Sequence, residues 1–358
     1  MLADSPWLLP VVGLIVGIVA GVVARWNHFC TLSALERYWY ANDSSGIRTW
    51  VLAGAVALLT TQLLLAFNVI NIDESFYLSP NISLIGSVCG GIIFGFGMAL
   101  VGTCGFGALV SLGGGSLKSL IVVAAIGLSA LAAQRGVIAN LRVSFVEPLS
   151  LDLGTSSQSI AAIAEKITGQ SMPFTIAVML SAALLFWIFS TPEFRRDKRS
   201  ITTGMIIGLC VTFGWLATSL LSNYMYRTVQ IESASFVLPP GELVFGLIAV
   251  TGSVPDYGVG LVLGVIFGAW IVAVRTHDVR WEACDDAREL GRHLAGAFLM
   301  GTGGVLAAGC TVGQGISALS TMALSAPLVF ISICIGARLG LKALIEGSSS
   351  LLPRALKW

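Results

Sequence analysis

Charge is the scarcest feature of this sequence. Only 11% of its 358 residues are Asp, Glu, Lys or Arg, against about a quarter in a typical soluble domain, whereas 56% are hydrophobic. Lys and Arg total 20 and Asp and Glu total 19, so the basic excess that would indicate a nucleic-acid partner is missing. The three histidines are not at metal-ligand spacing, and we expect no metal or other cofactor. This composition indicates that a lipid bilayer surrounds the protein.

Close cysteine pairs are also missing from the sequence. None of the seven cysteines forms a CxxC motif, which disfavours thioredoxin-type redox chemistry and zinc ribbons. Most lie in apolar runs, where a free thiol packs as a small hydrophobic side chain. No basic residue precedes the apolar run 7–24, so we expect a retained first helix rather than a cleaved signal peptide.

Apolar runs that are suited to membrane helices recur along the whole chain. They lie at 7–24, 50–70, 83–101, 120–133, 173–190, 201–221, 241–251 with 258–274, 294–309 and 324–345. A spanning helix needs about 20 residues, and several runs are shorter or rich in glycine. Because the runs are continuously apolar rather than alternating, we predict an all-α polytopic integral membrane protein with about eight or nine membrane-embedded segments, some broken or re-entrant.

The charged connections between the runs predict an orientation. Connection 191–200 is the most basic and is expected to be cytoplasmic under the positive-inside rule. Connections 25–48 and 275–292 are expected on the same side, the second as a short amphipathic helix. The polar connection 137–171 is expected outside, and this count of loops also places the N-terminus outside.

Two stretches are free of Asp, Glu, Lys and Arg over more residues than one span can use. They run between Glu74 and Lys118 and between Arg292 and Arg338. A continuous helix of either length would measure roughly 65 Å, about twice the thickness of the hydrocarbon core. Each stretch is therefore expected to fold back within the membrane, at the glycine-rich segments 102–107 and 309–315.

These two glycine-rich segments align with each other when Cys104 is placed on Cys310. The same offset of 206 pairs Gly95 with Gly301, Gly97 with Gly303, Gly107 with Gly313 and Ser111 with Ser317. We predict a single membrane domain, 1–358, built from a first repeat (1–136), a connection (137–199), a second repeat (200–345) and a tail (346–358). Interrupted hydrophobic segments at equivalent positions of two repeats are typical of a transporter binding site.

Glycine at small-xxx-small spacing indicates close helix packing, which is sufficient to explain Gly13, Gly17, Gly91, Gly95, Gly296 and Gly303. The denser glycines around Cys104 and Cys310 are expected to interrupt the helix instead. A helix that restarts after either cysteine presents unpaired N–H groups and the positive end of its dipole, which favour an anion. The thiol adds a weak donor and a polarizable contact, suited to a sulfur-bearing solute.

Residues 95–107 with 113–120 resemble the first motif of the YeeE/YedE family of sulfur-compound transporters, and 299–303 with 308–315 resemble its second. Phe29-Cys30 matches the early Phe-Cys of the family, and the resemblance covers most of the chain, weakly in 137–200. It implies a multi-pass protein of the bacterial inner membrane that imports thiosulfate and is not an enzyme. A separate TusA-like sulfur-carrier protein is an implied partner.

The resemblance also implies that three cysteines relay the anion, here Cys30, Cys104 and Cys310. A weaker match pairs Gly13 and Gly17 with Gly204 and Gly208 at an offset of 191. This offset places Leu221 opposite Cys30, so the third thiol is expected to have no counterpart. Together with the anion-site argument, this predicts the substrate-binding residues, which are Cys30, Cys104, Gly105, Phe106, Gly107, Cys310, Thr311, Val312, Gly313 and Gln314.

The first motif reads Gly-Thr-Cys where Gly-Gly-Cys is common in the family. This departure leaves the cargo open among thiosulfate, sulfite, sulfide, a persulfide and a selenium compound. Two other functions stay open from the sequence. A membrane thiol oxidoreductase could use the same cysteines, although it would need a close cysteine pair. A passive small-anion channel could use the same helix ends, although it gives no reason for thiols in both halves.

Overall fold

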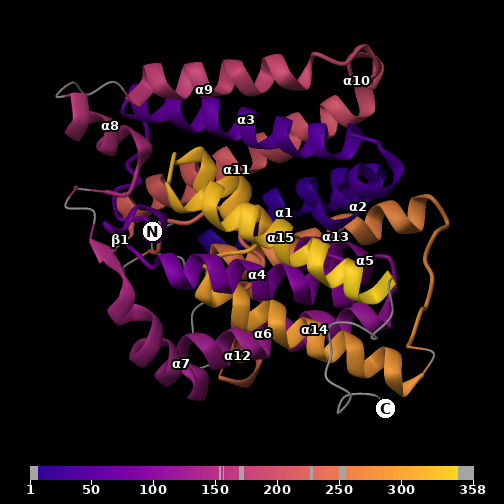
Figure 1. Cartoon of the computed structure of the whole chain (residues 1–358). Helices are drawn as coiled ribbons and strands as arrows, with labels where there is room; N and C mark the ends of the chain where they lie inside the picture. The colour runs from indigo at the N-terminus through magenta and orange to yellow at the C-terminus, as the bar shows by residue number, and fades with distance from the viewer. Residues whose placement is uncertain are drawn as a thin grey trace.

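The computed structural model describes residues 7–345 apart from 153, 154, 156, 169–172, 226–228, 250–254 and 285. The secondary structure of this part is almost entirely helical (Figure 1). Its elements are α1 (Leu8–Asn27), α2 (Thr31–Ala41), α3 (Ser45–Ala66), η1 (Phe76–Leu78), β1 (Asn81–Ile82), α4 (Leu84–Val101), α5 (Gly105–Gly113), α6 (Leu117–Arg135), α7 (Val137–Leu141), η2 (Arg142–Val146), η3 (Glu147–Leu149), β2 (Leu151–Asp152), α8 (Ile160–Thr168), α9 (Pro173–Ile188), α10 (Pro192–Arg196), α11 (Lys198–Tyr224), α12 (Pro239–Ile248), α13 (Tyr257–Arg275), α14 (Ala287–Leu306), η4 (Gly313–Ala318) and α15 (Ser325–Ile345).

The long apolar helices confirm a polytopic all-α membrane protein. Seven segments of the described chain are long and apolar enough to cross a bilayer, which are Leu8–Ala41, Ser45–Ala66, Leu84–Gly113, Leu117–Arg135, Lys198–Tyr224, Tyr257–Arg275 and Ser325–Ile345. α9 is a shorter apolar helix. The strands β1 and β2 pair as a two-stranded antiparallel sheet. The count of eight or nine embedded segments stays a prediction.

Glycine sets how closely the long helices approach. On α1, a Cβ atom added to Gly13 or Gly17 would collide with backbone atoms of α13. On α4, Gly95 meets the backbone of α15 in the same way, a Cβ on Gly91 would lie 2.7 Å from Ser332 Cβ of α15, and Gly97 faces Gly296 of α14. These contacts confirm the packing role predicted for the small-xxx-small glycines, because only a residue without Cβ fits at such a distance.

The helix neighbours form two matching sets. α1 packs along α13 and α4 along α15, while α11 packs along α3 and α14 along α6. These pairs correspond when α1 is aligned with α11 and α4 with α14, as the sequence offsets predict. α4 and α14 run antiparallel, since Gly86 lies beside Leu306 and Gly97 beside Gly296.

The connections predicted to share one side of the membrane do lie at one end of the helices. Arg25 forms a salt bridge with Asp278 (2.9 Å), and the Asn27 side chain donates to Ser200 Oγ (3.4 Å). Arg48 donates to the Ile188 carbonyl (2.7 Å), which ties the start of α3 to the end of α9.

The predicted short amphipathic helix over 275–292 is wrong. α13 ends at Arg275, and His277 follows in the left-handed region (φ 54°). The next residues run extended beside the start of α6, where the Leu117 N–H donates to the Glu282 carbonyl (2.8 Å). The charged residues after Asp286 form the first turns of α14, whose N-terminus Asp286 caps by accepting from the Glu289 N–H (2.7 Å).

A candidate path lined by thiols

The first helix break lies where the glycine-rich segment predicts it. α4 ends at Val101, Gly102 adopts a left-handed conformation (φ 82°), and α5 begins at Gly105. Cys104 is the N-cap of α5, and its Sγ accepts a hydrogen bond from the Gly107 N–H at 3.3 Å. Ser, Thr, Asp and Asn usually fill this role, so the thiol replaces an oxygen at a helix N-terminus.

The second break has the same design. α14 ends at Leu306, and Ala308 (φ 53°) and Gly309 (φ 154°) turn the chain. The helix that restarts at Thr311 contains the π-helix η4, and Cys310 Sγ accepts from the Gly313 N–H at 3.3 Å. Cys104 and Cys310 therefore hold equivalent places, each fully buried beside the amide of the third residue after it.

Cys30 lies in a third break, between α1 and α2, as the N-cap of α2. Its thiol lies 3.6 Å from Cys104 Sγ and 3.6 Å from Thr103 Oγ1. The fold thus brings together two predicted site cysteines as free thiols, although no CxxC motif joins them. In the described part of the chain, no hydrogen bond links Cys310 to either of them.

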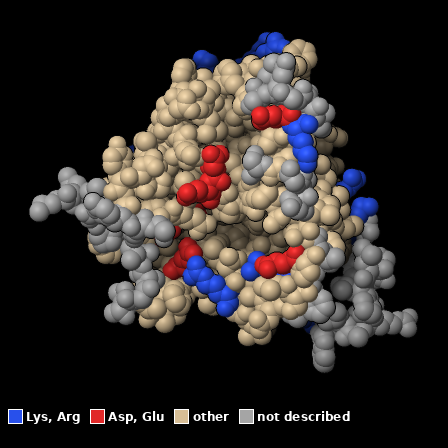
Figure 2. Space-filling view, turned by 90° about the vertical axis from the view of Figure 1, so that its left-hand side faces the viewer, with Lys and Arg blue, Asp and Glu red and all other residues tan. Residues whose placement is uncertain are grey.

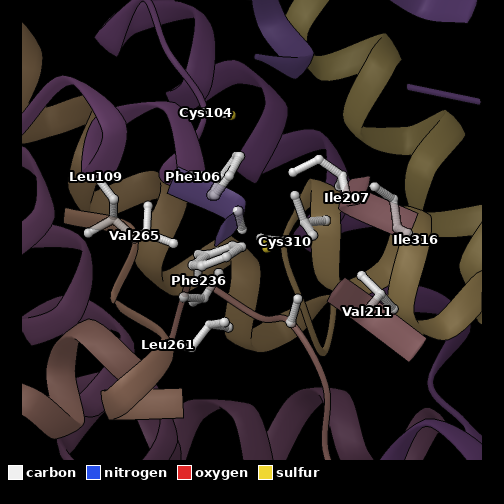
Figure 3. Close-up of a cluster of buried hydrophobic side chains, with 14 of the residues drawn as sticks. Cys104, Phe106, Leu109, Ile207, Val211, Phe236, Leu261, Val265, Cys310 and Ile316 are labelled. Atoms are coloured by element: carbon white, nitrogen blue, oxygen red, sulfur yellow. The ribbon is translucent and has the colours of Figure 1, made fainter. Parts of the chain in front are cut away.

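Phenylalanine rings lie beside the thiols. The Phe106 ring, directly after the first break, packs against Phe29 (6.2 Å between centroids) and Phe236 (4.8 Å). Figure 3 shows Phe106 and Phe236 side by side, next to Cys104 and Cys310. The Phe236 carbonyl also faces Gly105, 3.3 Å from the position of an added Cβ. Apolar rings thus stand at the junction of the two breaks.

The other predicted site residues have different surroundings. Gly107 and Gly313 donate to the two cysteines, and Thr311 and Val312 are buried in the second restart. The Gln314 amide is already engaged: Nε2 donates to the carbonyls of Ala307 and Ala308 (both 3.0 Å), and Oε1 accepts from Ser325 (3.4 Å). Gln314 therefore satisfies carbonyls at the C-terminus of α14 and fixes the turn that presents Cys310.

We expect Gln314→Leu to lower the thermal stability of the purified protein while the KM for its anion changes less than about twofold. The substitution leaves the buried Ala307 carbonyl without its donor, which costs about 1–3 kcal/mol. Heating in detergent followed by size-exclusion chromatography measures the first effect, and uptake kinetics measure the second. A large rise in KM at unchanged stability would show instead that Gln314 contacts the cargo directly.

A cavity of about 510 Å³ opens beside the first break, and we call it the Arg25 cavity. Gly102 and Thr103 line it, next to Cys30. Its wall has four cationic side chains and three carboxylates, which are Arg25, Lys118, Arg280 and Arg292 with Asp278, Glu282 and Glu289. The balance is slightly positive, which favours anions.

A larger cavity of about 850 Å³ opens beside the second break, and we call it the Glu232 cavity. Gly309 and Ser235 line it, next to Cys310. Figure 2 views this end of the molecule, where a hollow is bordered by acidic and basic side chains. Burial, with Asp256 and Glu242 nearby, raises the pKa of the Glu232 carboxyl well above its usual range. The carboxyl thus tends toward its neutral form, which repels an anion less.

The two cavities lie at opposite ends of the helices. α6 contributes Lys118 to the Arg25 cavity and Gln134 to the Glu232 cavity. Its 19 residues make a helix about 28 Å long, which is close to the hydrocarbon thickness. α14 likewise reaches the first cavity with Arg292 and the second with Gly304. Two polar cavities separated by buried thiols and rings, within a bundle of spanning helices, define a membrane transport protein.

The chain belongs to the sulphur transport family, whose sequence profile matches residues 27–339. This confirms the YeeE/YedE resemblance and a transport rather than an enzymatic role. Two similar proteins are both named Thiosulfate transporter TsuA. The one from Spirochaeta thermophila is 24% identical over 334 residues, covering 90% of this chain and 96% of its own. The one from Escherichia coli K12 is 24% identical over 326 residues, covering 85% and 86%.

Thr103 and Phe236 also border the candidate path, and the sequence did not predict them. Thr103 was visible only as a departure from the family motif, yet its hydroxyl faces the Cys30 thiol. Phe236 lies in a connection that carries no motif, and its proximity to Phe106 arises from contacts distant in sequence. No local pattern predicts such a contact.

Proposed function

We propose that this protein imports thiosulfate, or a closely related small sulfur anion, across the bacterial inner membrane. The observation that carries the proposal is the pair of buried N-cap thiols, Cys104 and Cys310, between two polar cavities. The names of the two relatives supply the cargo.

The proposed route runs from the Glu232 cavity past Cys310, past the Phe106 and Phe236 rings, to the paired Cys104 and Cys30, and out through the Arg25 cavity. Thiosulfate carries a soft terminal sulfur and two negative charges. Thiols are weak donors and polarizable partners, so they contact the soft sulfur without attaching a fixed counter-charge that would trap the ion. The positive ends of α5 and of the helix that begins at Thr311 favour its charge.

The predicted site residues have different roles along this proposed route. Cys30, Cys104 and Cys310 contact the cargo, Phe106 borders the passage, and Gly105, Gly107 and Gly313 leave room at the two restarts. Thr311, Val312 and Gln314 shape the second restart. We further propose that the repeats 1–136 and 200–345 form an inverted pair and that the Arg25 cavity is cytoplasmic. A TusA-like carrier would then receive sulfur at that side.

The direct test is uptake of radiolabelled thiosulfate by bacteria that lack their own thiosulfate and sulfate importers and express this gene. Import is expected only in cells that carry the gene, and unlabelled thiosulfate should compete far better than sulfate. Sulfite competition reports how strictly the terminal sulfur is required. Expression at normal levels in the membrane without any thiosulfate uptake would refute the proposal.

A further inference from the structure

The hydroxyl of Tyr77 is buried next to the second break, beside the Ser235 side chain, and makes no close hydrogen bond within the described part of the chain. Tyr77 lies in η1 and is 2% exposed. Its OH is 2.9 Å from the position that a Cβ on Gly313 would occupy, and 3.5 Å from the corresponding position on Gly309. Buried polar groups in folded proteins are nearly always paired, so an unpaired donor facing a helix restart indicates a ligand.

Two further polar atoms converge on the same backbone position. Ser235 Oγ lies 3.4 Å and Cys310 Sγ 3.7 Å from the Cβ position of Gly313. Ser235 is partly exposed and lines the Glu232 cavity, so an anion in that cavity reaches its hydroxyl. Tyr77 lines a smaller cavity of about 160 Å³, and Ala308 lines both cavities. The hydroxyl of Thr311, the residue after Cys310, also has no hydrogen-bond partner among the residues that the structure describes.

The first break carries an equivalent group of three side chains. Around the Cβ position of Gly107 lie Cys30 Sγ (3.1 Å), Cys104 Sγ (3.5 Å) and, closest of all, Thr103 Oγ1. Each break therefore has beside it an N-cap cysteine, a side chain from a separate segment and a hydroxyl. In space, Ser235 rather than Leu221 holds the place that corresponds to Cys30. The second half lacks the extra thiol but has a hydroxyl there.

We propose that Tyr77 and Ser235 form, with Cys310, a separate oxyanion subsite on the Glu232 cavity side. The two hydroxyls donate to oxygen atoms of the anion, and the thiol contacts its sulfur. The Cys30, Thr103 and Cys104 group has two thiols and one hydroxyl, so it favours sulfur over oxygen. An anion with both kinds of atom would thus be held by its oxygens at one end of the route and by its sulfur at the other. This inference rests on the proposed function.

The test is the kinetics of thiosulfate uptake by Tyr77→Phe and Ser235→Ala, with the amount of protein in the membrane measured by immunoblot. Each substitution removes one donor to a charged ligand, so KM is expected to rise about tenfold while Vmax changes less than about twofold. Ser235→Cys keeps a donor and imitates Cys30, so its KM should stay within about threefold of wild type. Tyr40→Phe, at an exposed tyrosine of α2, is the matched control.

The outcomes separate this inference from the proposed function. Wild-type KM in both variants, alongside wild-type uptake by the unchanged protein, would overturn the subsite and leave the transport function standing. Reduced protein in the membrane with an unchanged KM would mean that the hydroxyls only stabilise the fold, which also overturns it. If the unchanged protein takes up no thiosulfate, both proposals fail.

Discussion

Replacing Cys104 by alanine is expected to reduce thiosulfate uptake about a hundredfold or more, which corresponds to roughly 2.8 kcal/mol. Cys104 Sγ is the atom that joins the Cys30 thiol to the N-terminus of α5, at 3.6 Å from one and 3.3 Å from the Gly107 nitrogen. Alanine removes the sulfur contact and the cap together. Loss of a cap costs about 0.5–2 kcal/mol, which a helix packed on all sides tolerates. Labelled uptake, normalised to protein in the membrane, measures the effect.

Serine at the same position separates the role of sulfur from that of a cap. Cys104→Ser keeps a hydroxyl that caps α5 at least as well, so the protein should be as stable as wild type. Uptake should still fall strongly, because oxygen lacks the softness of sulfur. Cys310→Ala and Cys310→Ser are expected to behave in parallel. Cys89→Ala, at an exposed cysteine of α4, is the control and should transport normally. Normal uptake by both alanine variants would contradict a cysteine relay.

The two helix breaks could be predicted from the sequence because their causes are local. Length arithmetic shows that a charge-free stretch cannot be one span, and the glycines at 102, 105 and 107 show where it ends. The structure places Gly102 in a left-handed conformation and starts α5 three residues later. Cys104 and Cys310 each precede a restarting helix, and the sulfur of each accepts from the amide of the third residue after it. Cys30, the N-cap of α2, makes no such bond.

The partners of these cysteines could not be predicted, because they come from distant parts of the chain. Cys30 and Cys104 are 74 residues apart and lie in separate motifs, so no local pattern links them. Ser235 and Tyr77 lie in connections without periodicity, and only the folded chain brings them to Gly313. The sequence offset points to Leu221 as the counterpart of Cys30, whereas the side chain that reaches Gly313 is Ser235. Ser235 lies in an extended segment, and Cys30 lies at the start of a helix.

The expected amphipathic helix at 275–292 shows how composition misleads when backbone geometry decides. Mixed charges are compatible with a surface helix, and nothing in the pattern reveals that the backbone N–H of Arg280 donates to the carbonyl of Gly114. That pairing holds the segment extended and closes one side of the Arg25 cavity. The charged residues of 275–292, which were predicted to form one helix, are divided between this extended segment and the first turns of α14.

Gly264→Leu is expected to leave less than about a tenth of the wild-type amount of folded protein in the membrane. A Cβ on Gly264 would collide with the carbonyl of Leu14 and lie 2.8 Å from Gly17 Cα, and both obstacles are backbone atoms of α1. A side chain can rotate away, whereas a backbone yields only if the helices separate. Overpacking a core costs about 1–3 kcal/mol, and a loss of about 1–2 kcal/mol already lowers the amount of a protein in cells several-fold. Fluorescence-detected size-exclusion chromatography measures the folded fraction.

Gly291→Leu is the matched control for this substitution, because Gly291 has nothing within 4 Å of its Cβ position and lies in the exposed first turns of α14. It should accumulate like wild type. If Gly264→Leu did so too, the tight contact between α1 and α13 would not be needed for folding.

The contact between α1 and α13 also bears on the proposed route, since Gly113 at the end of α5 packs on the Ile266 carbonyl of α13. Helix α13 therefore positions α5, the helix that Cys104 caps. We expect Gly264→Ala to give more folded protein than Gly264→Leu, and this folded protein should still transport more slowly than wild type.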